Sequence, residues 1–182
     1  MVKVSFKPKQ ITKKLLGALP DRARDVIVKR YGLGTDTDTQ TLESIGQTYG
    51  ITRERVRQIE NYAIATIQKS DAYKENEAIF GELRGVLDDM GGVIAERGLL
   101  DALAKDDETQ NHFYFLLVIG SDFIKHKEDD HFAHRWHVNK DVAGSVESAL
   151  RNLHGAIGED ELVPEGDLMA LLVKKLQEEE IT

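Results

Sequence analysis

The fold is decided by the stretch TLESIGQTYGITRERVRQIE, which occupies residues 41–60. Thr41 and Thr52 each precede a run with apolar residues at helical spacing, and threonine is a favourable N-cap residue. Between the two runs, Gly50 marks a tight turn. Two short helices that meet at a Gly-containing turn form a helix-turn-helix, so the sequence predicts this motif here.

The second predicted helix has two chemically different faces. Apolar residues recur every three or four positions and are predicted to face inward: Val56, Ile59, Ala63 and Ile67. Hydrogen-bonding side chains cluster in the first two turns and are predicted to face outward: Arg53, Glu54, Arg57, Gln58 and Asn61, with Arg55 on the flank. A recognition helix meets base edges with this N-terminal end when it enters the major groove of DNA.

The outward residue types suit direct base reading. Arginine pairs with guanine, glutamine with adenine, and a carboxylate accepts from the cytosine amino group. The sequence therefore predicts four base-reading residues: Arg53, Glu54, Arg57 and Gln58. Phosphate contacts are predicted for Thr41, Arg55 and Arg30, because hydroxyl groups, guanidinium groups and the first amides of a helix all suit phosphate oxygens.

Charge is distributed unevenly along the chain of 182 residues. Residues 1–70 carry 13 basic and 7 acidic side chains, a net charge of +6. Residues 71–182 carry 11 basic and 25 acidic side chains, a net charge of −14. A polyanion is attracted to the first segment and repelled by the second, so double-stranded DNA is expected to contact residues 1–70.

The residues from about 11 to 70 resemble region four of bacterial RNA polymerase sigma factors. The similarity includes LGALPDRARDVIVKRYGL (residues 16–33) and, more specifically, TRERVRQIE (residues 52–60). It implies that Arg53, Glu54 and Gln58 read the upstream promoter hexamer, and that Arg55 and Arg57 contact bases or backbone nearby. It also implies docking on the flap of the polymerase β subunit.

Two features depart from that family. About ten residues precede the similar segment, so a chain that is complete is not expected to melt promoters as a sigma factor does. After Glu60 the family usually continues with basic residues, whereas NYAIATI (residues 61–67) is neutral, which predicts weaker phosphate affinity.

The second half of the chain predicts further helices and a hairpin. A boundary at Ser70–Asn76, either a linker or a continued helix, separates a domain of residues 1–70 from an acidic domain of residues 71–182. The predicted elements there are helices over about 77–90, 96–104, 109–119, 141–153 and 165–176, a short strand at 93–94, and hairpin strands at 122–126 and 131–138. This order predicts a winged-helix-like α+β domain, so the whole chain is expected to be mainly α.

Other classes of function are disfavoured. The chain has no cysteine, which excludes disulfides, thiol catalysis and Cys-based metal sites. Strand alternation places His134 opposite His131 and His137, so no metal site is predicted. No nucleophile with an orienting base and no phosphate-binding loop is present, so no catalytic residue, cofactor or enzyme activity is expected. Without a long apolar stretch, we expect no membrane contact and a cytoplasmic location.

Two hypotheses follow for function. The first is a sequence-specific DNA-binding transcription regulator with a region-four-like reading helix. The second is an interaction module that binds RNA polymerase or a transcription factor, with DNA contact secondary. The acidic second domain suits protein docking or a homodimer better than a second DNA contact, because its third helix lacks a basic face.

Overall fold

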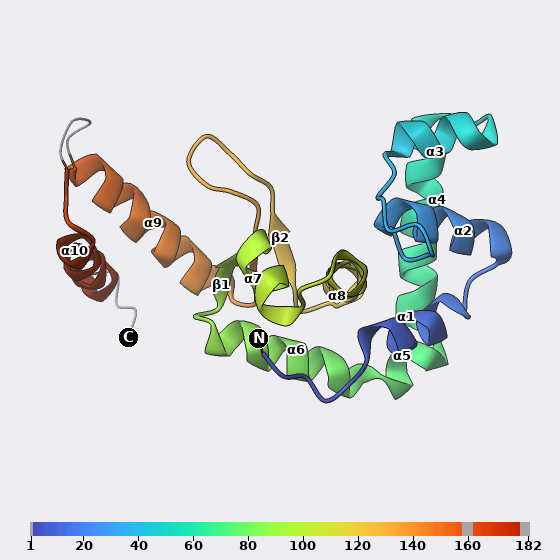
Figure 1. Cartoon of the computed structure of the whole chain (residues 1–182), viewed down its shortest axis with the longest axis horizontal. Coiled ribbons are helices and arrows are strands. Elements are labelled where there is room, and N and C mark those ends of the chain that lie inside the picture. The colour runs from blue at the N-terminus through green and yellow to red at the C-terminus, as the bar shows by residue number, and fades with distance from the viewer. Residues whose placement is uncertain (1, 158–161, 179–182) are drawn as a thin grey trace. The chain divides into compact units, whose positions relative to one another are not determined.

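The structure is a computed structural model that describes residues 2–157 and 162–178 (Figure 1). Its helices are α1 (Pro8–Leu16), α2 (Asp21–Tyr31), α3 (Leu42–Tyr49), α4 (Arg53–Lys69), α5 (Asp71–Glu75), α6 (Glu77–Asp89), α7 (Glu96–Leu103), α8 (Asp107–Ile119), α9 (Lys140–Ala156) and α10 (Glu165–Glu178). Its strands are β1 (Val93–Ala95), β2 (Ile124–His126) and β3 (Arg135–His137). The predicted mainly-α class with an N-terminal helix-turn-helix is confirmed.

The chain divides into two compact units. The first runs to Val86 and resumes at Arg97–Phe123, and the second comprises Leu87–Glu96 and the described residues from Ile124 onward. Helix α8 thus shares a unit with the N-terminal helices. The sequence-based division into domains of residues 1–70 and 71–182, with a boundary at Ser70–Asn76, remains a prediction.

Local contacts define the end of the first helix and the structure of the predicted boundary segment. Helix α1 begins at Pro8, because proline is tolerated in the first helical turn, and it ends at Leu16. The Arg24 guanidinium closes the following turn by donating to the carbonyls of Leu16 (3.1 Å) and Leu19 (2.8 Å). The boundary segment contains a separate short helix, α5, whose N-cap Ser70 accepts a hydrogen bond from the Tyr73 amide.

Aromatic side chains of α8 form much of the core of the first unit. Helix α8 packs against α1, α2 and α4. The Phe115 ring is fully buried, with its centroid 5.2 Å from that of Tyr31 on α2. The Asn111 side-chain amide donates to the carbonyls of Gly32 (3.2 Å) and Thr37 (2.8 Å), so α8 also holds the loop that leads into α3.

The second unit contains an antiparallel sheet with strand order β1-β3-β2. Trp136 of β3 pairs with Ile94 on one side and Lys125 on the other, and its side chain is buried. The Trp136 indole donates a hydrogen bond to the Glu96 carboxylate at 2.9 Å. The same carboxylate forms an ion pair with Lys125 at 2.6 Å.

Both hairpin strands are shorter than predicted, and the loop between them explains why β3 begins only at Arg135. The Asp129 carboxylate accepts hydrogen bonds from the amides of His131 (2.9 Å) and Phe132 (3.0 Å). This side chain turns the backbone away from the sheet, so residues 131–134 do not extend β3. The strand predicted over residues 131–138 is therefore confirmed only at Arg135–His137, and the alternation predicted for His131 and His134 is wrong.

The winged-helix assignment remains a prediction. The order of α6, β1, α7, α8, β2 and β3 is that of a winged helix, but α8 and the sheet belong to different compact units. Among the described helices, none is long and apolar enough to cross a membrane.

Candidate nucleic-acid interface

Both predicted threonine caps are present in the helix-turn-helix. The Thr41 hydroxyl accepts from the Ser44 amide, and the Thr52 hydroxyl accepts from the Arg55 amide, each at 3.1 Å. Between the helices, Gly50 has a φ of 62°, in the left-handed region that favours glycine. The turn therefore forms as the sequence predicts.

A small apolar cluster fixes the angle between the two helices. Val26, Ile45 and Val56 are fully buried and come from α2, α3 and α4. Gly46 lets α3 approach the turn closely, because a Cβ atom there would lie 2.7 Å from the Ile51 carbonyl oxygen. The start of α4 is thus positioned by packing on its inner face, which leaves its outer face to solvent.

The structure gathers the predicted base-reading residues on one exposed surface. Arg53, Glu54, Arg57 and Gln58 all lie in the first two turns of α4 and are exposed, as is Arg55. This is the end of α4 that lies beside α3, whereas α1 and α5 lie at the other end (Figure 1). We call this group, Arg53 to Gln58 without the buried Val56, the reading surface.

Within the reading surface, the side chains form two hydrogen-bonded pairs. Arg57 binds Glu54 through two hydrogen bonds of 2.8 and 2.7 Å, and Arg55 donates to the Gln58 side chain at 3.0 Å. All four side chains are exposed. Exposed pairs at this spacing contribute little to stability, so these groups can exchange their partners for base edges or phosphates.

The ionised Glu54 carboxylate partly offsets the positive charge of the neighbouring Arg57. Hydrogen bonds from Arg57 lower the pKa of Glu54, so this group is ionised at neutral pH. The reading surface therefore combines a cationic attraction to DNA with one anionic group that repels phosphates. A carboxylate at such a place favours sites where a base amino group compensates it.

Replacing Glu54 with glutamine is expected to strengthen binding to random-sequence duplex several-fold. The ratio of the affinity for the best site to the affinity for random sequence should therefore decrease. The substitution removes one negative charge facing the phosphates and releases Arg57. Fluorescence anisotropy with a specific and a scrambled duplex measures both effects. Glu43→Gln is a matched control, since Glu43 is also exposed but lies on α3. Equal effects of the two substitutions would contradict a base-directed role for Glu54.

The two remaining predicted phosphate contacts differ in their surroundings. Thr41 is exposed at the start of α3, where its hydroxyl already caps the helix. Arg30 is half-buried: its Nε donates to Glu60 at 3.3 Å and its Nη1 donates to the Gln40 carbonyl at 3.0 Å. Arg30 therefore joins α2 to α4 and to the preceding loop, and its phosphate contact remains a prediction.

Sequence reasoning missed a buried carboxylate that holds α4 in place. Glu60 is buried and accepts from the Tyr31 hydroxyl at 2.9 Å as well as from Arg30. Its position was visible in the pattern, because Glu60 follows Val56 by four residues and so lies on the apolar face. Ile59, which the sequence places inward, is only partly buried.

The Tyr31–Glu60 contact predicts a loss of stability at high pH. Burial, with the nearby Glu60 carboxylate, raises the pKa of Tyr31 far above its ordinary value near 10. The raised pKa stabilises the fold fully below about pH 10. Above it, Tyr31 lowers the free energy of unfolding by up to about 1.4 kcal/mol per pH unit. Urea unfolding between pH 8 and 11 measures this slope, which should be shallower in Tyr31→Phe and unchanged in Tyr62→Phe, whose ring is exposed.

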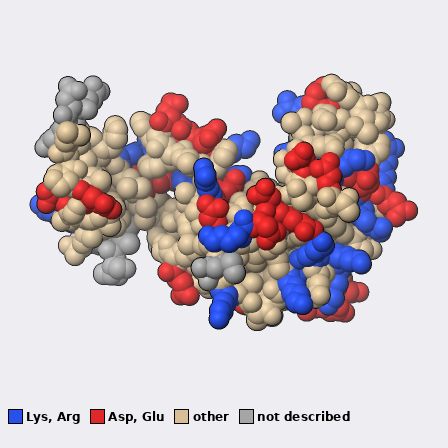
Figure 2. Space-filling model, in the orientation of Figure 1, with Lys and Arg blue, Asp and Glu red and all other residues tan. Residues whose placement is uncertain are grey.

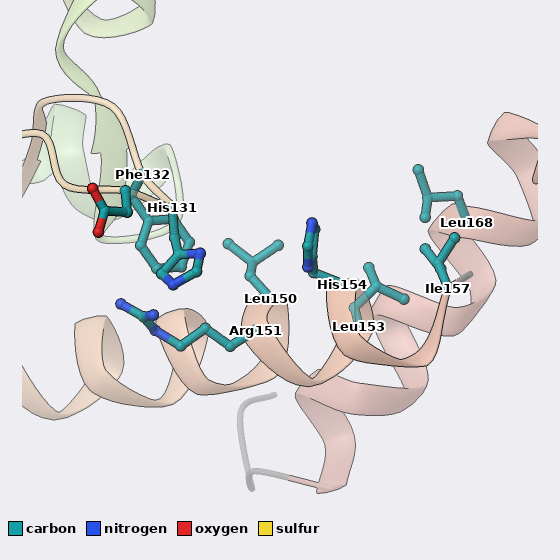
Figure 3. A pocket seen from close by; sticks show the side chains of 9 residues that line it. His131, Phe132, Leu150, Arg151, Leu153, His154, Ile157 and Leu168 are labelled. Atoms are coloured by element: carbon teal, nitrogen blue, oxygen red, sulfur yellow. The ribbon is translucent and has the colours of Figure 1, made fainter. Parts of the chain in front are cut away.

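The second unit contains a hollow of about 560 Å³ that none of the helix-turn-helix residues lines. In Figure 3, Leu150, Arg151 and His154 of α9 line it together with Phe132 of the loop between β2 and β3 and Leu168 of α10. The Arg151 guanidinium lies 4.9 Å from the centre of the Phe132 ring. Within residues 2–157 and 162–178, no group of three or more His, Asp or Glu side chains could hold a metal ion.

Comparison with known proteins identifies the helix-turn-helix. Residues 15–69 match the family model of sigma-70, region 4. These residues contain both capped helices, the turn between them and the whole reading surface. This segment is sigma region-four-like, as the sequence predicts, and it covers about a third of the chain.

Curated relatives match the same part of the chain. The region-four-like segment is 42% identical over 55 residues to the RNA polymerase principal sigma factor HrdD of Streptomyces griseus, covering 30% of this chain and 16% of that protein. It is 49% identical over 55 residues to the RNA polymerase sigma factor SigA of Nostoc sp., covering 30% and 14%. SigA of Listeria monocytogenes is 41% identical over 61 residues, covering 34% and 16%. The match thus spans about one-sixth of these relatives, and no solved structure matches the chain.

Proposed function

We propose that this protein is a sequence-specific DNA-binding transcription regulator whose helix α4 reads a promoter element in the major groove. One observation carries the proposal. The reading surface is exposed on the first two turns of a helix that a well-packed helix-turn-helix presents, inside the region-four-like segment. The proposed role is non-enzymatic and cytoplasmic.

The dimensions of the groove favour this role. The major groove of B-form DNA is about 12 Å wide and admits one α-helix, which presents its N-terminal side chains to base edges. Arg53, Glu54, Arg57 and Gln58 would then contact bases. Arg55, Thr41 and Arg30 would contact phosphates beside the groove.

Selection of bound duplexes from a random pool tests the proposal. The full chain should enrich one short sequence, and enrichment should decrease as salt increases, because phosphate contacts release counterions. A single hexamer resembling an upstream promoter element would support a sigma-like reader. A palindrome would indicate a homodimer that reads two half-sites. Absence of any enriched sequence at low salt would contradict the proposal.

A second candidate function is binding to RNA polymerase, with the flap of the β subunit as the contact. The names of the curated relatives favour it, since each is an RNA polymerase sigma factor. The acidic second half of the chain also suits a protein partner better than DNA. Pull-down of purified polymerase core by the full chain, with and without the selected duplex, separates the two functions. Failure to retain polymerase in either condition would remove this candidate.

A further inference from the structure

Helix α10 (Glu165–Glu178) packs against α9 in the second unit and is apolar on all of its sides. Its middle, LMALLV at residues 168–173, is a run of consecutive apolar residues, and such a run points in every direction around a helix. A helix that is apolar all round is normally buried in a protein. Between Glu165 and Gln177, however, no residue of α10 is buried, so α9 covers only one of its sides.

The partly buried leucines identify the side of α10 that contacts α9. Leu168, Leu172 and Leu176 are spaced four residues apart, so they form one stripe along the helix, and all three are partly buried. In Figure 3, Leu168 lies near Ile157 at the end of α9, and both residues line the same hollow. The contact with α9 therefore uses this stripe and leaves the exposed side chains of α10 uncovered.

An exposed apolar patch lies beside the leucine stripe. Met169 is 52% exposed and Val173 is 49% exposed, although both side chains are large and apolar. Gly166 and Ala170 are also exposed, and they lie three residues before Met169 and Val173 respectively, so the four residues adjoin on the helix surface. We call these four residues the docking face. In Figure 2, the surface over α10, at the left of the view, consists mostly of residues other than Lys, Arg, Asp and Glu, with acidic side chains in one strip.

Two opposite charges border the docking face and indicate which partner fits it. Asp167 and Lys174 are both exposed, and neither forms an ion pair within the part of the chain that the structure describes. They are seven residues apart, close to two helical turns, so they lie on the same side of the face. If two copies of α10 pack antiparallel about a two-fold axis between Ala170 and Leu171, Asp167 of each copy lies opposite Lys174 of the other. A parallel pair would instead place like charges together.

We propose that the docking face binds a second copy of this chain through antiparallel packing of α10 against α10. Met169 and Val173 of each copy cover the docking face of the other, and two Asp167–Lys174 ion pairs border the contact. One helix from each copy makes a small interface, so the dimer is expected to be weak and to depend on concentration. The contact lies in the second unit and needs no DNA, so its failure is distinguishable from failure of the proposed function.

Sedimentation equilibrium of the full chain without DNA tests the proposal. The mean mass should increase with concentration from that of one chain, 20.4 kDa, toward that of two. Val173→Glu should weaken the association by about tenfold or more, because it places a carboxylate within an apolar contact. Leu162→Glu is the matched control and should leave the association unchanged, since Leu162 is 98% exposed and lies outside α10. The mass of a single chain at every concentration up to about 1 mM, or equal effects of the two substitutions, would overturn the proposal.

Exchanging the two charges separates a contact between copies from an effect within one helix. Asp167→Lys and Lys174→Asp should each weaken the association by about threefold or more, because each places like charges opposite one another. The double substitution restores opposite charges and should return the association toward that of the unaltered chain. If these charges acted only on the dipole of their own helix, the double substitution would be the most harmful of the three. That order of effects would contradict antiparallel pairing.

Discussion

Replacing Arg53 with alanine is expected to reduce affinity for the selected duplex by about 5- to 150-fold and to reduce affinity for a scrambled duplex far less. A good contact between an arginine and a base is worth about 1–3 kcal/mol of discrimination, which corresponds to that range. Arg53 is the first residue of α4 and is exposed, so its loss leaves the packing of the helix-turn-helix unchanged. Anisotropy titrations with both duplexes at fixed salt measure the effect.

Lys69→Ala is the matched control for Arg53→Ala. Lys69 is an exposed cation on the same helix, but it is the last residue of α4, remote from the turn. Its removal should weaken both duplexes slightly and to the same degree. If Arg53→Ala also weakened both duplexes equally, Arg53 would contact phosphates and would not read bases.

Replacing Gly46 with valine is expected to lower the free energy of unfolding by about 1–3 kcal/mol and to abolish most of the sequence-specific DNA binding. A side chain here meets the Ile51 carbonyl oxygen, and backbone atoms cannot rotate away as a flexible side chain can. Overpacking of this kind costs about 1–3 kcal/mol. The helices must separate, which displaces the start of α4 relative to α3. Urea unfolding and anisotropy measure the two effects.

Gly81→Val provides the comparison for that substitution. Gly81 also lies inside a helix, α6, but nothing lies within 4 Å of a Cβ atom placed there. Valine at this position should change stability little and leave DNA affinity unchanged. Normal stability and DNA affinity in Gly46→Val would contradict the close approach of α3 to the turn.

The helix-turn-helix could be predicted because local signals agree there. Thr41 and Thr52 have the chemistry of N-caps, Gly50 has the freedom that the turn requires, and the apolar spacing of α4 matches its buried face. The exposed set from Arg53 to Gln58 follows from the same pattern. The caps, the turn and the helix face each depend on interactions between residues a few positions apart, and a sequence pattern can indicate such local interactions.

Contacts between distant parts of the chain could not be predicted in this way. The bonds from Asn111 to Gly32 and Thr37 join residues more than 70 positions apart, and no local pattern indicates them. The sequence predicts that Arg30 contacts phosphate because a guanidinium group suits phosphate oxygens. Its bond to Glu60 becomes visible only when α2 and α4 are packed together.

Chemical-shift mapping of the isotope-labelled full chain with the selected duplex tests the central claim most directly. The largest changes should fall on the amides of residues 52–61 and on the side-chain signals of Arg53, Arg57 and Gln58, with smaller changes at Thr41 and Arg55. A scrambled duplex should shift the phosphate-contacting residues while leaving the Gln58 amide nearly unchanged. Saturable shifts confined to other helices, with the start of α4 unaffected by the selected duplex, would contradict the account.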